Sequence, residues 1–408
     1  MTSRYASLSR AELAALVPEL LLIGQLIDRA GMAWCIVEFG REEMLQVAIE
    51  EWAGSSPLYT KRMQKALKYE GVDVITIFKG LQLDIGAPPQ FMDFRYTVHD
   101  RWHGEFHLDH CGALMDVEPM GPDYVRGMCH DIEDPTFDAT ALATNRRCQV
   151  RPIHRPPRVP AGRTPACAWT VIIDESYPEV DFIPQLDIIG ATRAYQCELD
   201  DIDPADEGQA DYAGPLVSDV DFSAFSHSAL VRIADEVCLQ MHLLVLSFAL
   251  AVRARCNGDA EKERSIRTKS LIGISGVAAE RIQKVLDLPN DAAGALRVLE
   301  LHPLLNPAAY VSVDVSDSEA HVHPSPAHED GAWITLVSPE SDLPLQAIAT
   351  AVNPLLRAEV SGDATDWTVR FIETDTPAKE LGEVSVCKVS SGAAWVFEER
   401  KSLPLTVV

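Results

Sequence analysis

The period of the hydrophobic pattern changes along this chain, and that change restricts the fold more than any other feature. Ser9 and Glu12 have the spacing of a capping box, and apolar residues then recur at helical intervals up to residue 69. From Phe94 to Leu108, apolar and polar residues instead alternate with the period of a β-strand. Helices followed by an antiparallel hairpin predict an α+β fold, with N-terminal helices on an antiparallel sheet.

The later part of the chain is expected to be helical first and sheet-like afterwards. One long helix is predicted at 226–256, and a small antiparallel sheet with a packed helix is predicted from Tyr310 onward. The expected strands there are YVSVDV, WITLV, WTVRFIE, EVSVCKV and AAWVFE, and the expected helix is 343–356. Pro18 is expected to kink or break the first helix.

These patterns suggest four parts and no internal repeat. The parts are an α+β domain rich in Cys and His (1–175), an acidic linker (176–225), a helical segment (226–305) and a small α+β domain (306–408). The linker is assigned from its acidic composition, which is typical of a solvated segment. A chain of 408 residues also exceeds the size at which single cores usually stop growing.

Composition restricts the partners and the compartment. A hydrophobic fraction of 47% is enough to fill a core, and a net charge of −26 disfavours nucleic acid and anionic membranes. No secretory signal or transmembrane helix is predicted, so we expect a cytoplasmic protein. Nine cysteines in such a chain favour free thiols or metal ligands over disulfides. The expected partners are a small-molecule substrate and a second copy of the chain, as a homodimer or other homo-oligomer.

Chemistry is expected between Phe91 and Asp174, which contains six of the twelve histidines and four of the nine cysteines. A metal site can be assembled there if one strand face and the end of the next helix come together, since Zn²⁺ takes four Cys and His ligands. The predicted ligands are His107, Cys111, Cys129 and His130. The alternative is that the cysteines are buried thiols and the histidines make local hydrogen bonds.

The same residue types allow nucleophilic and acid–base catalysis. A cysteine thiolate can form when a neighbouring histidine or arginine lowers the thiol pKa, and a nearby carboxylate can act as a general base. The predicted catalytic residues are Cys111, Cys129, His130, Asp131 and Glu133. Arginines can clamp a substrate carboxylate through paired hydrogen bonds. The predicted substrate-binding residues are Arg95, Arg151, Arg155 and Arg158. The alternative for the carboxylates is a solvated helix end. The alternative for the arginines is a surface or interface arm.

The order of these features resembles a known family. A hairpin ending in FHLDHC, a helix ending in MCHDIED and a strand pair containing CAW are similar to the L-2-amino-thiazoline-4-carboxylic acid hydrolases and the related 4-vinyl reductase (V4R) domains. The resemblance covers about residues 1–175. It implies an α+β domain with a small-molecule pocket lined by Cys111 and Cys129, and it implies opening of a carbon–nitrogen bond, with Asp131 or Glu133 as an acid/base partner.

The sequence therefore predicts a hydrolase or lyase acting on a small anionic, carboxylated molecule that contains nitrogen or sulfur. Zinc or another divalent metal is the cofactor that the Cys and His residues could hold. No P-loop or dinucleotide fingerprint predicts a nucleotide cofactor. The C-terminal half is expected to supply a lid or a dimer interface. Two alternatives stay open: a non-enzymatic V4R-like binding or sensor module, and an assembly protein whose cysteines are structural.

Overall fold

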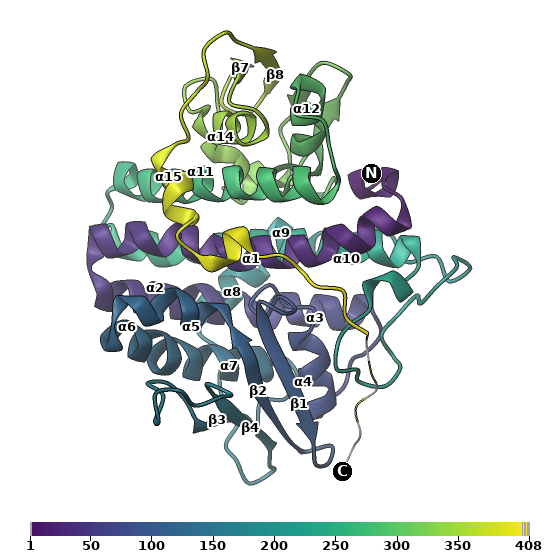
Figure 1. Ribbon diagram of the computed structural model, residues 1–408, viewed down its shortest axis with the longest axis vertical. Coiled ribbons are helices and arrows are strands. Elements are labelled where there is room, and N and C mark those ends of the chain that lie inside the picture. The colour runs from purple at the N-terminus through teal and green to yellow at the C-terminus, as the bar shows by residue number, and fades with distance from the viewer. Residues whose placement is uncertain (1, 402, 404, 406–408) are drawn as a thin grey trace.

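Two four-stranded antiparallel sheets lie at opposite ends of the molecule, and long helices separate them (Figure 1). The computed structural model describes residues 2–401, 403 and 405. Each sheet carries its own helices, and the second one packs with α14 (Leu343–Val352). The predicted α+β class, with N-terminal helices and a C-terminal sheet with a packed helix, is confirmed.

The first sheet and its helices come from the first half of the chain. Its strands are β1 (Met92–Val98), β2 (His103–Cys111), β3 (Cys148–His154) and β4 (Ala168–Ile173). The helices are α1 (Arg10–Phe39), α2 (Arg41–Ala53), α3 (Ser56–Ala66), α4 (Val74–Leu81), α5 (Gly112–Val117), α6 (Pro122–Arg126), a π-helical turn η3 (Gly127–Ile132), α7 (Glu133–Leu142), α8 (Pro184–Gly190) and α9 (Arg193–Gln196).

The second half repeats this plan. Its strands are β5 (Val313–Val315), β6 (Ala320–Val322), β7 (Leu356–Gly362) and β8 (Trp367–Glu373). Its other helices are α10 (His227–Arg255), α11 (Ala260–Val285), α12 (Ala292–Leu301), α13 (Pro326–Glu329) and α15 (Gly382–Cys387). Short 3₁₀ helices complete the chain: η1 (Arg4–Ser7), η2 (Glu118–Met120), η4 (Phe222–Ala224), η5 (Pro303–Leu305), η6 (Trp333–Leu336) and η7 (Ser391–Ala394).

Both sheets have the same strand order, because β1-β2-β4-β3 in the first corresponds to β5-β6-β8-β7 in the second. The helices match as well: α1 corresponds to α10, and α2 with α3 corresponds to the single helix α11. The segment that contains α3, GSSPLYTKRMQKAL (54–67), aligns with the segment that contains the last part of α11, GISGVAAERIQKVL (273–286). The two segments share Gly, Ser, Arg, Gln, Lys and Leu at equivalent positions. The expectation of no internal repeat was therefore wrong. We call residues 9–197 the N-terminal repeat and residues 226–397 the C-terminal repeat.

Matching hydrogen bonds fix this correspondence at single residues. Asn145, after α7, accepts from a backbone N–H two residues later and donates to the carbonyl of Val72 at 3.1 Å. Asn353, after α14, also accepts from a backbone N–H two residues later and donates to the carbonyl of Asn290 at 2.7 Å. In both repeats that carbonyl immediately precedes the aspartate that caps the next helix, α4 or α12.

The two repeats are joined by their long helices. α1 packs along both α10 and α11, while α10 packs along α2 and α3 (Figure 1). Buried ion pairs cross the junction in a reciprocal way: Arg281 contacts Glu19 at 2.6 Å, and Arg62 contacts Glu236 at 2.8 Å. Glu19 and Glu236 are equivalent positions, as are Arg62 and Arg281. One continuous hydrophobic core runs through both repeats.

The first hairpin differs from its predicted pairing at one place. Phe94 pairs with Leu108, but Met92 pairs with Cys111, so β2 contains one extra residue there. Such a β-bulge reverses the alternation that follows it. Cys111 therefore lies on the buried face of the sheet, whereas His107 is half-exposed on the outer face. The prediction that these two side chains share a face was wrong.

Three of the predicted C-terminal strands are not strands. WITLV forms η6 and EVSVCKV lies mostly in α15, whereas only the first two residues of AAWVFE belong to η7 and the rest form neither helix nor strand. The strands β6 and β7 were missed. Short apolar runs fit both periods, and tertiary packing decides between them. For α15, packing against α11 decides, because Gly276 leaves room for the side chain of Val384. Pro18 does not break α1, which is continuous.

Two helices, α1 and α10, are long and apolar enough to cross a membrane by length and composition. In their most apolar windows, 72% of the α1 residues and 83% of the α10 residues are buried inside the protein. Core helices of soluble proteins have the same properties, so these helices are compatible with a soluble protein.

Candidate functional site

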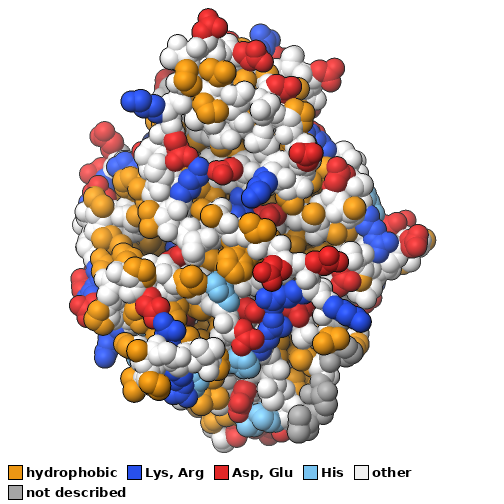
Figure 2. Space-filling view, viewed as in Figure 1, with side chains coloured by type: hydrophobic (Ala, Val, Ile, Leu, Met, Phe, Trp, Pro, Cys, Tyr) orange, Lys and Arg blue, Asp and Glu red, His pale blue; other side chains and the backbone are white. Residues whose placement is uncertain are grey.

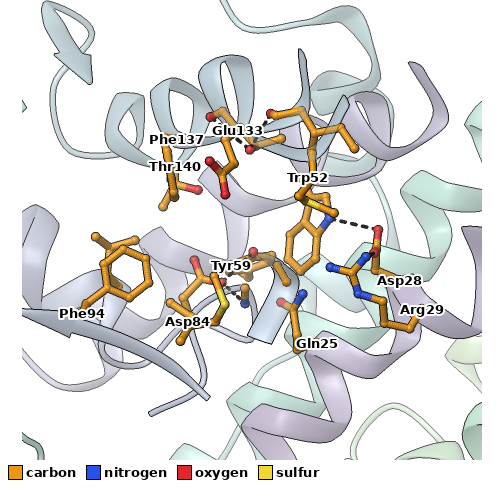
Figure 3. A pocket seen from close by; sticks show the side chains of 18 residues that line it. Gln25, Asp28, Arg29, Trp52, Tyr59, Asp84, Phe94, Glu133, Phe137 and Thr140 are labelled. Atoms are coloured by element: carbon orange, nitrogen blue, oxygen red, sulfur yellow. Dashed lines mark hydrogen bonds and ion pairs between the residues drawn. The ribbon is translucent and has the colours of Figure 1, made fainter. Parts of the chain in front are cut away.

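An acid-lined cavity lies in the N-terminal repeat between α1, α2, α3, α7 and β1 (Figure 3). Its volume is about 80 Å³. On this measure one water molecule needs ~10–15 Å³, so the cavity has room for several waters or a compact organic molecule. The lining side chains include three carboxylic acids, one arginine and four aromatic side chains: Asp28, Asp84, Glu133, Arg29, Trp52, Tyr59, Phe94 and Phe137, with Gln25, Thr136 and Thr140.

Helical spacing explains how the sequence brings these groups together. Gln25, Asp28 and Arg29 of α1 are three and four residues apart and therefore share one face of the helix. The same spacing places Glu133, Thr136, Phe137 and Thr140 on one face of α7. Figure 3 shows the carboxyl group of Glu133 pointing from α7 toward the space above Asp84 and Tyr59.

Asp84 is held in a fixed orientation in the loop after α4. Its Oδ1 accepts hydrogen bonds from the Tyr59 hydroxyl at 2.9 Å and from the Gly86 N–H at 2.7 Å. Burial raises the pKa of Asp84 to about 6, and these two hydrogen bonds limit the rise by stabilising the carboxylate. The C-terminal repeat supports the loop, because Gln240 of α10 accepts from Ile85 N–H at 3.1 Å and donates to the Leu83 carbonyl at 2.9 Å.

The pKa of Glu133 is shifted further from its usual value than the pKa of Asp84. Burial raises its pKa to about 8, and the charges of Arg155 and Arg29 oppose the rise while Asp134 adds to it. Among the described residues, no group hydrogen-bonds to Glu133 Oε2. The preceding turn η3 is π-helical, a geometry that is frequent at functional sites. Glu133 is therefore a neutral acid at pH 7 with one oxygen left for a ligand.

Asp28 and Arg29 line a further part of the cavity wall. Burial raises the pKa of Asp28, whose Oδ1 accepts from the Trp52 indole N–H at 3.4 Å. Burial also raises the pKa of Glu51 well above its usual range, and Asp28 adds to that rise. Arg29 Nη1 lies 3.5 Å from Asp28 and its Nε lies 3.6 Å from Asp116. In the described part of the chain, this buried Nε–H makes no hydrogen bond.

The C-terminal repeat provides an internal comparison for this cavity. Counted from the capping serines of α1 and α10 and along the aligned segments, the positions of Asp28, Arg29, Trp52, Tyr59, Phe137 and Thr140 are taken by Val245, Leu246, Leu271, Ala278, Leu345 and Ile348. All six of these replacements are buried apolar residues. By the same counts, Gln25, Asp84 and Glu133 correspond to His242, His302 and Ser341, which are polar. The place in the C-terminal repeat is therefore partly polar, but it has no carboxylic acid and no arginine at these positions, so the fold forms there without them.

The predicted catalytic residues are only partly brought to the cavity. Glu133 lines it, whereas Cys111, Cys129, His130 and Asp131 are not among its described lining residues. Burial raises the pKa of Cys111, Cys129 and Cys167, with Glu133 as a further cause for each, so these thiols are neutral at pH 7. His130 Nε2 donates to the Pro156 carbonyl at 2.7 Å, and Asp131 is exposed.

The predicted substrate-binding arginines are each paired with carboxylates of the protein. Arg95 contacts Asp93 at 2.9 Å, Asp219 at 3.2 Å and Asp109 at 3.4 Å. Arg151 contacts Asp138, Arg155 contacts Asp134, and Arg158 contacts Glu118. Figure 2 shows this intermixing of acidic and basic side chains on one face of the molecule. None of the four is among the described cavity-lining residues, and Arg29 takes that place.

The four predicted metal ligands do not form one group. The bulge separates His107 from Cys111, and His107 Nε2 instead contacts Asp109 at 3.3 Å. Within the described residues, metal-ligand types gather at two other places: His99 with His103 and Glu105, and His321 with His323 and Asp366.

Most of the cavity residues were missed because they lie outside the Cys- and His-rich segment. A signal for them exists in the sequence, since Gln25, Asp28 and Arg29 interrupt the apolar run LLLIGQLIDRAGMAW at helical spacing. The repeat also marks Asp28 and Arg29, because their counterparts Val245 and Leu246 are apolar.

A scan against protein-family models, a search of curated proteins and a search of solved structures find no match to this chain. The resemblance to thiazoline carboxylic acid hydrolases and V4R domains therefore stays a prediction.

Proposed function

We propose that this chain is a small-molecule hydrolase or lyase whose active site is the acid-lined cavity of the N-terminal repeat. The observation that carries the proposal is the difference between the repeats. Buried acids are costly, and strongly perturbed acids in a cavity are typical of functional sites. Here the other repeat has no carboxylic acid at the positions that correspond to Asp28, Asp84 and Glu133, which argues against a purely structural role for the acids.

The proposed chemistry uses Glu133 and Asp84 as an acid–base pair. Their pKa values, about 8 and about 6, leave Glu133 protonated and Asp84 mainly ionised at pH 7. In hydrolysis, Asp84 would accept a proton from water as the water oxygen bonds to the substrate carbon. Glu133 would donate its proton to the nitrogen that leaves with the electrons of the broken carbon–nitrogen bond.

The proposed substrate is compact and carries a carboxylate as well as this nitrogen. Arg29 is the cationic side chain of the described cavity lining, and its Nε–H makes no hydrogen bond, although the Asp116 carboxylate lies 3.6 Å away. A buried donor that makes no hydrogen bond is unfavourable, and a substrate carboxylate would satisfy it through a charge-assisted hydrogen bond. The aromatic walls at Phe94 and Phe137 would hold the apolar part of the substrate.

Turnover of a panel of amino-acid-derived amides and thiazoline carboxylates tests this proposal. Glu133→Gln and Asp84→Asn are expected to lose activity by roughly 10²–10⁴-fold while keeping the fold, as for removal of a general acid or base. Asp131→Asn, an exposed neighbour in η3, is the matched control and should retain activity. Full activity in both cavity variants would contradict the proposal.

A second candidate function is binding without turnover. It is favoured by Glu133 Oε2, which has no hydrogen-bond partner among the described residues and which a bound ligand satisfies equally well without reaction. Titration of the panel by isothermal calorimetry, beside the turnover assay, separates the two functions. Saturable binding that is lost in Arg29→Met, with no product from any compound, would establish the binding module.

A further inference from the structure

The outer face of the second sheet carries a cluster of histidines and carboxylates that is unrelated to the cavity. His321 lies on β6, His323 follows that strand, and Asp366 directly precedes β8. One ligand atom from each of these three residues lies within 4.8 Å of the other two. His321 Nε2 is 2.7 Å from Asp366 Oδ1, and His323 Nδ1 is 3.6 Å from Asp366 Oδ2. Pairing of β6 with β8 brings these histidines beside Asp366.

A fourth residue orients the cluster. His323 Nε2 lies 3.0 Å from Asp314 Oδ2 on β5. A carboxylate at one ring nitrogen fixes the proton there and leaves the lone pair on the other nitrogen, here Nδ1, free for a metal ion. Metal-bound histidines in proteins are commonly held by such a carboxylate behind the ring.

The first sheet shows that the fold does not require this cluster. Trp169 of β4 and Trp367 of β8 are equivalent positions in the two sheets. Each is buried and pairs with the neighbouring strand, Trp169 with Phe106 of β2 and Trp367 with Val322 of β6. In that register Ala168 takes the place of Asp366, so the first sheet lacks the acid that completes the set.

We infer that His321, His323 and Asp366 form a binding site for a divalent transition metal ion of the Zn²⁺ type. Two imidazole nitrogens and one carboxylate are typical ligands of Zn²⁺, and side chains that are roughly half exposed leave a fourth position for water. Asp314 acts as a positioning residue through His323. Because Asp314, His321 and Asp366 come from three adjacent strands, the bound ion would link β5, β6 and β8.

Isothermal titration with ZnCl₂ tests this site on full-length protein that has no histidine tag and has been freed of metal with EDTA. One equivalent of Zn²⁺ is expected to bind at this site at pH 7, and to be lost in His321→Ala and in Asp366→Asn. Asp314→Asn is expected to weaken binding by roughly 10–100-fold, as for other residues that orient a metal ligand. Mg²⁺ in excess should not compete, because it prefers oxygen ligands.

His103→Ala, in the other histidine group, is the matched control. It should leave the equivalent that depends on His321 unchanged, and circular dichroism should show that all variants are folded. Two outcomes would overturn the inference: no binding of Zn²⁺ to the wild-type protein, or the same number of equivalents in His321→Ala as in the wild type. Because none of these residues lines the cavity, the result does not depend on the proposed enzyme activity.

Discussion

Replacing Glu133 by Gln should make the protein more stable at alkaline pH. Burial raises the pKa of this carboxyl from 4.5 to about 8 in the folded protein, whereas the unfolded chain ionises it near 4.5. Between these two values the folded state binds more protons than the unfolded state, so the free energy of unfolding falls as pH rises. At ~1.4 kcal/mol per pKa unit, the full shift corresponds to about 5 kcal/mol lost by pH 9. Gln has a similar shape and no charge, so it removes this loss.

The assay is the melting temperature of wild type and variant between pH 5 and pH 9. The two proteins should melt together at pH 5, and Glu133→Gln should melt up to ~10 °C higher at pH 9, taking ~2 °C per kcal/mol for a unit of this size. Asp131→Asn serves as the control, because that side chain is exposed and should leave the curve unchanged. Parallel curves for wild type and Glu133→Gln would refute the assignment of Glu133 as a neutral buried acid.

Three other predictions concern the cavity, the junction and the thiols. Tyr59→Phe removes a hydrogen bond to the Asp84 carboxylate, so the pKa of Asp84 should rise above about 6, as measured by carboxyl ¹³C NMR; an unchanged titration would contradict the contact. Arg281→Met leaves buried Glu19 without its ion pair and should lower the free energy of unfolding by ~3–5 kcal/mol in urea titrations, with partial recovery when Glu19→Gln is added. Iodoacetamide followed by mass spectrometry should label Cys197 before the other eight cysteines, which are buried; faster labelling of any of those would contradict the burial.

The long helices and the first hairpin could be predicted from the sequence because their signals are local. The capping box at Ser9 forms as expected, with Ser9 Oγ accepting from the Glu12 N–H, and the long helix α10 lies at its predicted position. The period of the apolar residues and the cap are both set within a few residues, so no tertiary contact is needed to find them.

The site could not be predicted in the same way, because its geometry depends on single-residue and long-range events. One extra residue in β2 moves Cys111 to the buried face and away from His107. The acids of the cavity come from α1, the loop after α4 and α7, and only tertiary packing brings them together. Glu133 was identified because it lies near a cysteine in the sequence, whereas Asp84 and Arg29 offered no such motif.

The two repeats also differ in the free-energy cost of buried acids, because the C-terminal repeat has no acid at the positions of Asp28, Asp84 and Glu133. In a symmetric dimer of identical chains, a buried acid appears in both subunits, and its cost is incurred twice. Each residue with the pKa shift of Glu133 costs about 5 kcal/mol at high pH, which is comparable to the net stability of ~5–15 kcal/mol of a whole domain. Because the repeats are fused, a substitution in one does not alter the other. The C-terminal repeat, which lacks these acids, can therefore act as a stability reserve for the N-terminal repeat.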